Sequence, residues 1–125
     1  MADAHWQQEP EKHDFAAASD YLSLLFPPRE ARDLVERLRS GQAVDRKAKD
    51  LLRAARLPLL PTDDPAVARD LAKVAEGKKL SPVLLVRGRA RKNIPLTVAD
   101  GYHRICASYH LGEEEDVACR IVELP

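Results

Sequence analysis

The chain has 125 residues, with 20 Lys and Arg balanced by 20 Asp and Glu, and 45% of its residues are hydrophobic. This length predicts one compact domain, and the composition excludes an intrinsically disordered chain and a polybasic nucleic-acid tail. Two cysteines are too few for a disulfide framework, and the sequence shows neither a signal peptide nor a run of about 18 apolar residues. We therefore expect a cytoplasmic protein with reduced thiols and no membrane partner.

The first 56 residues predict a polar arm followed by helices. Residues 1–13 are polar apart from Trp6, which indicates a flexible tail or a short docking arm. Residues 14–56 form a helical N-terminal segment, in which apolar residues recur at helical spacing. The first predicted helix is capped by Asp14 or Ser19 and runs to Leu25, where Pro27 and Pro28 stop it. The second starts after these prolines and runs up to Gly41, and the third runs from about Asp45 to Arg56.

Residues 57–125 predict the sheet. Leu57–Leu60 is a candidate edge strand, because it is apolar but carries a proline. Asp64 and Pro65 mark the start of a helix that Gly77 closes. The remaining elements are a hairpin of strands over 82–86 and 96–99, a helix over 102–111 and a last strand over 117–122.

These elements predict an α/β (α+β) fold. We expect a small mixed sheet of about four strands in β-α-β-β-α-β order, with an N-terminal helical layer beside it. The helical segment and the sheet domain are too short to bury much surface separately, so they are expected to pack as a single unit.

The most informative motif is Asp100-Gly101-Tyr102-His103-Arg104, where a strand is followed by a helix. The free amides and dipole of a helix N-terminus stabilise a phosphate, and an arginine adds two parallel hydrogen bonds. Gly101 allows close approach to the backbone, His103 exchanges a proton near neutral pH, and Asp100 orients a hydroxyl or a metal ion. The alternative is a purely structural turn, with Asp100 as a helix cap.

Three features occur together in residues 57–124: Leu80–Arg87 before a hairpin, the turn at residues 100–104 with Ala107, and Gly112 before the closing strand. With these features the segment resembles the ParB/sulfiredoxin superfamily. The resemblance implies a small mixed sheet with flanking helices, and a turn that holds nucleotide phosphates. The D-G-x-H-R form is similar to that of ADP-dependent free-serine kinases, where the turn lies at the active site.

On this resemblance, a nucleotide (ATP, ADP or CTP) with Mg²⁺ is the implied cofactor. The implied nucleotide-binding residues are Gly101, Tyr102, His103 and Arg104, and the implied catalytic residues are Asp100 and His103. Sulfiredoxins place a cysteine directly before the His-Arg pair, but this chain has Tyr102 there, so sulfinic acid reduction is not expected. Partition proteins continue into a helix-turn-helix region, which is not expected here because the chain stops at Pro125.

Two other side-chain groups suggest chemistry less strongly. The basic segment Arg87, Arg89, Arg91 and Lys92 is a candidate nucleic-acid contact, and its structural alternative is a solvated hairpin tip. His103, Cys106, His110 and Cys119 lack the paired spacing of zinc ligands, so no metal site is expected.

The leading functional prediction is a nucleotide- or phosphate-binding domain whose partner is a nucleotide or a phosphorylated small molecule. Its enzymatic form would be a small-molecule phosphotransferase. The alternative is a non-enzymatic DNA-associated or protein-adaptor module. A nuclease ranks last, because the sequence shows no carboxylate cluster for two-metal cleavage.

Overall fold

Strand β2 (Val83–Val86) lies at the centre of the fold, and all four of its residues are buried. The structure is a computed structural model and describes residues 5–125. β2 pairs in parallel with β4 (Asp116–Val122) and antiparallel with β3 (Thr97–Asp100), while β1 (Val44–Lys47) pairs antiparallel with β4. The result is a four-stranded mixed sheet in the order β1-β4-β2-β3, which confirms the predicted fold class.

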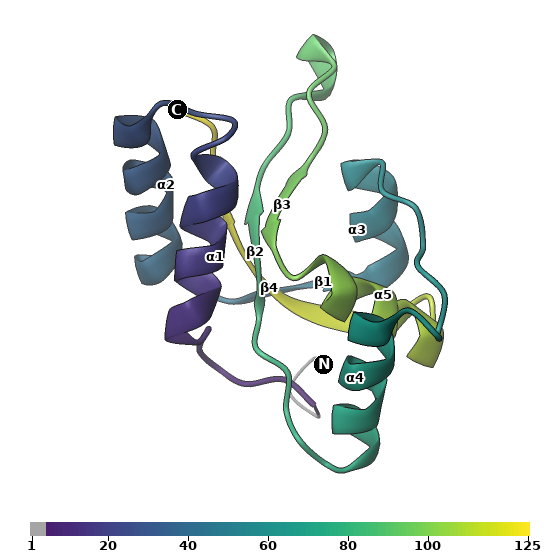
Figure 1. Cartoon of the computed structure of the whole chain (residues 1–125). Helices are drawn as coiled ribbons and strands as arrows, with labels where there is room; N and C mark the ends of the chain where they lie inside the picture. The colour runs from purple at the N-terminus through teal and green to yellow at the C-terminus, as the bar shows by residue number, and fades with distance from the viewer. Residues whose placement is uncertain (1–4) are drawn as a thin grey trace.

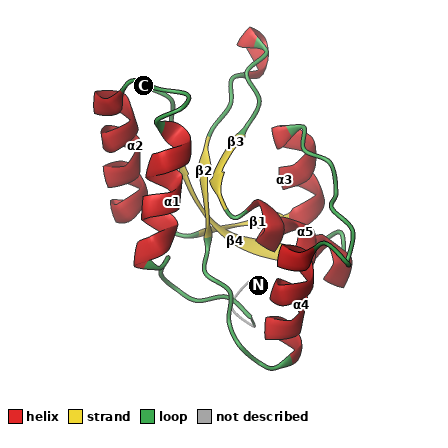
Figure 2. Cartoon of the chain, viewed as in Figure 1, coloured by secondary structure: helices red, strands yellow, loops and turns green. Residues whose placement is uncertain are grey.

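Helices cover both faces of this sheet (Figures 1 and 2). One face carries α1 (Lys12–Leu22) and α2 (Pro28–Ser40), and the other carries α3 (Ala48–Ala55), α4 (Pro65–Ala75) and α5 (Tyr102–Leu111). Because side chains alternate along a strand, Leu84 packs toward α1 and α2, while Val83 and Leu85 pack toward α3, α4 and α5. A strand buried on both faces needs an apolar residue at every position, which explains the unbroken run in β2.

Strand β1 corrects the prediction of a helix from Asp45 to Arg56. The helix α3 begins only at Ala48, and residues 44–47 pair with β4 instead. Val44 is half-buried and the three charged residues after it are exposed, which suits an edge strand. The apolar spacing of the segment fitted a helix, but pairing with the free edge of β4 determines its conformation.

The predicted strand at Leu57–Leu60 is wrong. These residues form an irregular connection between α3 and α4, so the first strand of the sheet is β1. The carbonyl oxygens of Pro58 and Leu60 accept hydrogen bonds from side chains of α5, namely the Tyr102 hydroxyl and an imidazole nitrogen of His110. In a strand these carbonyl groups would bond to a neighbouring strand, but here side chains of α5 satisfy them.

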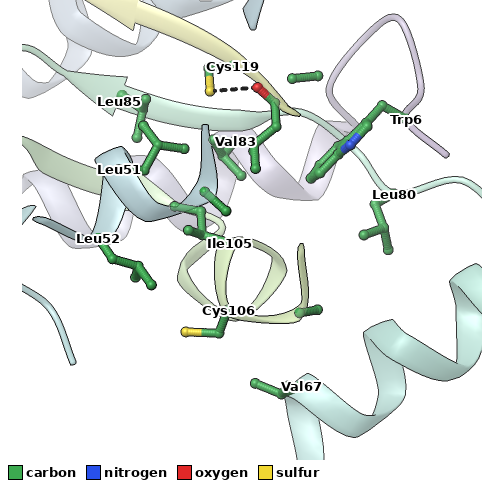
Figure 3. Packing of buried hydrophobic residues seen from close by; sticks show 14 residues of the cluster. Trp6, Leu51, Leu52, Val67, Leu80, Val83, Leu85, Ile105, Cys106 and Cys119 are labelled. Carbon is green, nitrogen blue, oxygen red and sulfur yellow. Dashed lines mark hydrogen bonds between the residues drawn. The ribbon is translucent and has the colours of Figure 1, made fainter. Parts of the chain in front are cut away.

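Residues 5–11 form a docked arm and not a free tail. Trp6 is only 2% exposed and lies in the core cluster around β2 and α5 (Figure 3), and its backbone bridges Leu80. Residues 1–4 of the predicted tail lie outside the described residues. The helix α1 then begins at Lys12, where Asp14 is not the cap but a third-position residue that accepts a hydrogen bond from the Glu11 amide.

Several local predictions are confirmed. The Asp64 carboxylate caps α4 by accepting hydrogen bonds from the amides of Ala66 and Val67. The hairpin of β2 and β3, the helix α5 and the closing strand β4 lie where the sequence places them. None of the helices in residues 5–125 has both the length and the apolar character needed to cross a membrane.

Candidate functional site

The turn between β3 and α5 is fixed by Gly101. Its φ is +113°, a conformation that disfavours any residue with a Cβ atom. A Cβ atom built there would lie 2.4 Å from Val83 Cγ1 and 2.7 Å from Val83 Cβ. The group that approaches the Gly101 backbone closely is therefore the Val83 side chain of β2. It occupies the space that a ligand was expected to take.

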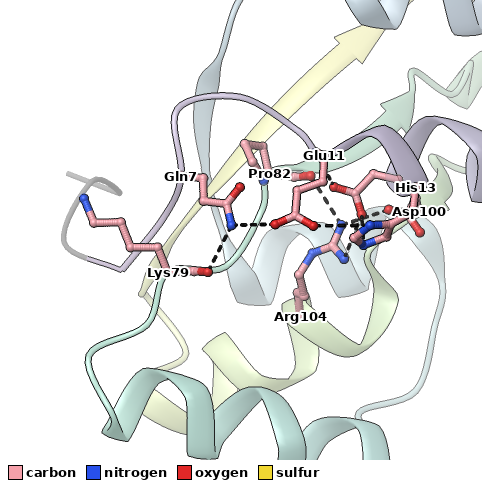
Figure 4. A network of polar contacts seen from close by, with 8 residues as sticks. Gln7, Glu11, His13, Lys79, Pro82, Asp100 and Arg104 are labelled. Atoms are coloured by element: carbon pink, nitrogen blue, oxygen red, sulfur yellow. Dashed lines mark hydrogen bonds and ion pairs between the residues drawn. The ribbon is translucent and has the colours of Figure 1, made fainter.

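Arg104 turns inward from the first turn of α5 (Figure 4). Its Nη2 donates to Asp100 Oδ2 at 3.0 Å and to the Pro82 carbonyl at 3.3 Å, and its Nη1 lies 3.6 Å from Asp14 Oδ1. The Arg104 side chain is 16% exposed and that of Asp14 is 1% exposed. The guanidinium is thus held between two carboxylates from α1 and β3, and its Nε has no hydrogen-bond partner among residues 5–125.

The two carboxylates around Arg104 differ in proton affinity. Burial, helped by the neighbouring Asp14, raises the pKa of Asp100 to about 6, although the Arg104 charge and hydrogen bond oppose the shift. Burial acts on Asp14 in the same direction. However, a Ser81 hydrogen bond and the Arg104 charge outweigh burial there, and the pKa of Asp14 is lowered. Asp100 is therefore the member of the pair that takes up a proton first.

A small polar cavity of about 90 Å³ adjoins Arg104. Its lining includes Ser81 and, on α4, Asp70 and Lys73. Burial raises the pKa of Asp70, and the charges of Arg104 and Lys73 oppose that shift. Lys79 contributes its carbonyl, which accepts from Gln7, while its side chain points away from the network (Figure 4).

His103 and Tyr102 leave the first turn of α5 in other directions. The His103 side chain is 48% exposed, and its Nε2 lies 3.9 Å from Asp64 Oδ2 at the start of α4. The Tyr102 hydroxyl donates to the Pro58 carbonyl at 2.5 Å. Of the predicted site residues, the structure therefore joins Asp100 to Arg104, and it places His103 and Tyr102 against the segment that leads into α4.

The two cysteines are packing residues. Both are fully buried, and the Cys119 thiol donates to the Val117 carbonyl (Figure 3). Burial raises the pKa of Cys106 and raises that of Cys119 to about 12, so neither is a reactive thiolate at neutral pH. In residues 5–125, no group of three or more His, Cys, Asp or Glu side chains is placed to hold a metal ion.

The basic segment extends from the body of the molecule on the β2–β3 hairpin (Figure 1). Arg87 pairs with Glu123 at 2.8 Å, whereas Arg89, Arg91 and Lys92 are exposed near a short 3₁₀ turn. The tip is anchored by Arg56, whose Nη2 donates to Asn93 Oδ1 at 2.6 Å.

Sequence reasoning missed the residues that surround Arg104. Asp14, Asp70 and Ser81 belong to α1, α4 and the loop before β2, and no local motif connects them. The one available signal was an acidic residue in the first turn of α1, which is also ordinary helix chemistry.

Comparisons of the chain with family models, with curated proteins and with solved structures gave no match. The resemblance of residues 57–124 to the ParB/sulfiredoxin superfamily therefore remains a prediction from the sequence. What the structure itself defines is a class: an α+β domain with helices on both faces of a mixed sheet and a partly buried arginine–carboxylate cluster at its strand-to-helix turn.

We expect Gly101→Ala to destabilise the protein by about 2–4 kcal/mol, because it combines a left-handed backbone with an overlap against Val83. Gly77→Ala is the matched control, since Gly77 has a φ of +80° but nothing within 4 Å of the added Cβ. It should cost only about 1 kcal/mol. Urea denaturation measures both values, and equal losses would contradict a packing role for Gly101.

We expect the Asp100 carboxyl group to titrate with a pKa of about 6, and Asp14→Asn to lower that pKa by removing a neighbouring negative charge. Carboxyl ¹³C NMR measures both values, with the exposed Asp20→Asn as the control. The folded protein binds this proton more tightly than the unfolded chain, whose pKa is near 3.8. The Asp100 contribution to stability should therefore fall as the pH rises from about 4 to above 6. An unchanged Asp100 pKa in Asp14→Asn would contradict the coupling.

Proposed function

We propose that the protein binds a nucleotide or another phosphate-bearing small molecule at the first turn of α5. The observation that carries the proposal is the rigid mounting of this turn. Gly101 packs on Val83 and Arg104 bonds to Asp100 and the Pro82 carbonyl, so the inner side of the turn is locked. The first amides of a helix have no acceptor within the helix. Because these donors are already oriented, they bind an anion without a large loss of conformational entropy.

His103 is the side chain that completes this proposed site. It is half-exposed in the first turn of α5, next to the free amides, and its ring can donate to a phosphate oxygen. Arg104 has a different role from the one the sequence suggested. Its guanidinium is already bound to two carboxylates, so it positions the turn and is not expected to contact the phosphate directly.

Phosphoryl transfer is a more specific proposal with less support. Asp100, one of the two residues that the resemblance implies as catalytic, has its carboxylate bound to Arg104 and adjacent to Asp14. The same contacts make Asp100 and Asp14 a poor fit for a Mg²⁺ ion held by the chain, because both already neutralise Arg104. Binding is accordingly the function that we test first.

We expect titration with ADP, ATP, CTP or inorganic phosphate, with and without Mg²⁺, to give saturable amide NMR shifts centred on residues 101–105. His103→Ala should reduce the affinity for the tightest-binding of these ligands about 10-fold, because one charge-assisted hydrogen bond is lost. His13→Ala is the matched control, because His13 is also exposed but lines the Arg104 cavity. Shifts confined to that cavity, or no shifts at millimolar ligand, would overturn the proposal.

The exposed basic hairpin supports a second candidate function, a DNA-associated module. The hairpin extends from the body of the molecule (Figure 1), and its three cations Arg89, Arg91 and Lys92 are exposed, so a phosphate backbone can reach them. We expect duplex DNA to bind at 50 mM salt and the double variant Arg89→Ala/Arg91→Ala to abolish this binding. The double variant Arg29→Ala/Arg32→Ala in α2 removes the same charge elsewhere and should bind normally. Fluorescence anisotropy distinguishes the variants, and equal behaviour would rule out a role for the hairpin.

A further inference from the structure

A larger cavity than the one beside Arg104 lies between the docked arm and residues of β1 and β4. It has a volume of about 480 Å³, which is within the usual range for small-molecule sites. Its walls are the docked arm at residues 6–9, the connection at residues 41–43 and the sheet residues Asp45, Ala118 and Arg120. Apart from Gln7, it shares no lining residue with the cavity beside Arg104.

Arg120 gives this cavity its chemistry. It is only 4% exposed, so it is a buried cation in the middle of β4. Its Nη1 donates to the carbonyls of Leu38 and Arg39, at 3.1 and 2.7 Å, and so satisfies the C-terminal end of α2. Its Nη2 donates to the carboxylate of Glu9, and its Nε has no partner among residues 5–125.

Arg120 can give a carboxylate two parallel hydrogen bonds, from Nε and Nη2, but it gives Glu9 only the one from Nη2. The Nε and Nη2 hydrogens of a guanidinium point the same way and together match the two oxygens of one carboxylate. Here one Glu9 oxygen, Oε2, accepts from Nη2 of Arg120. The Glu9 side chain is 77% exposed, so it can return to water at little cost in desolvation.

A second unpaired donor belongs to another lining residue, Trp6. Trp6 is only 2% exposed, and its buried indole Nε1 has no acceptor among the described residues. Both unsatisfied groups, the Trp6 indole and the Arg120 Nε, can only donate. A ligand that satisfies them must bring acceptor atoms. The remaining wall offers apolar surface from the Trp6 ring, Ala43 and Ala118.

We propose that this cavity binds a small organic monocarboxylic acid with an apolar body. The ligand carboxylate takes the place of Glu9 at Nη2 of Arg120 and adds the bond to Nε, while its body lies against Trp6 and Ala118. Glu9 and Asp45 give the lining two negative charges against one positive charge, which favours a monoanion over a phosphate. Glu9 is then an internal substitute for the ligand, one that holds the buried cation until the acid displaces it.

Trp6 makes the proposal directly measurable, because it is the only tryptophan of the chain. We use phenylacetate as the probe and its uncharged analogue phenylacetamide as the control ligand. Phenylacetate should change the tryptophan fluorescence saturably in the millimolar range or below, with amide NMR shifts at Gly41, Ala43 and Ala118. Phenylacetamide should bind at least 10-fold more weakly. Equal responses to the two compounds, or none up to 10 mM, would overturn the proposal.

Variants of the arm test the exchange of carboxylates. Glu9→Gln removes the internal competitor and should tighten phenylacetate binding about 10-fold, whereas Glu11→Gln, which lies on the same arm but not in this cavity, should leave it unchanged. Ala43→Leu adds an apolar side chain to the exposed rim of the cavity and should reduce binding at least 10-fold. An unchanged or weaker affinity in Glu9→Gln would contradict the proposed replacement, even if the cavity binds the probe.

Discussion

The largely buried guanidinium of Arg104, whose side chain is 16% exposed, connects three elements that lie far apart in the sequence. It contacts Asp14 in α1, Asp100 at the end of β3 and the carbonyl of Pro82 just before β2. Removing one partner of a buried ion pair leaves an uncompensated charge and typically costs about 3–5 kcal/mol. The N-terminal helical layer is therefore held to the turn by electrostatics as well as by apolar packing, and the geometry of the turn depends on α1 being in place.

Arg120 in β4 repeats the arrangement with one decisive difference. Each arginine uses its two terminal nitrogens and leaves a buried Nε unpaired. The counterions of Arg104 are themselves buried, with Asp14 1% and Asp100 17% exposed, whereas Glu9 beside Arg120 is 77% exposed. A buried counterion cannot leave without a large desolvation or pairing penalty, but an exposed one can. Because of this contrast, we assign Arg104 a structural role at the turn and propose that Arg120 exchanges Glu9 for a ligand carboxylate.

The sequence predicted the elements whose signals are local. The Asp64-Pro65 cap, the apolar run of β2 and the turn at Gly101 each contain the reason for their own conformation. It failed at β1 and at Leu57–Leu60, where hydrogen-bond partners distant in sequence decide between strand, helix and loop. The candidate site was half predicted for the same reason: the turn is local, but its partner Asp14 is 86 residues away from Asp100 in the chain.

The structural role of the arm, residues 5–11, was the hardest feature to predict from the sequence. A polar stretch with one tryptophan has too little apolar surface to predict docking by itself, yet Trp6 fills a position in the core and Glu9 pairs with a buried arginine. Gln7 lines the cavity beside Arg104 as well as the one beside Arg120. The arm is held by two contacts that differ in exposure, since Trp6 is 2% exposed and the Glu9 side chain is 77% exposed. Because the ligand proposed for the Arg120 cavity replaces only the exposed contact, we expect Trp6 to keep the arm docked while the carboxylates exchange.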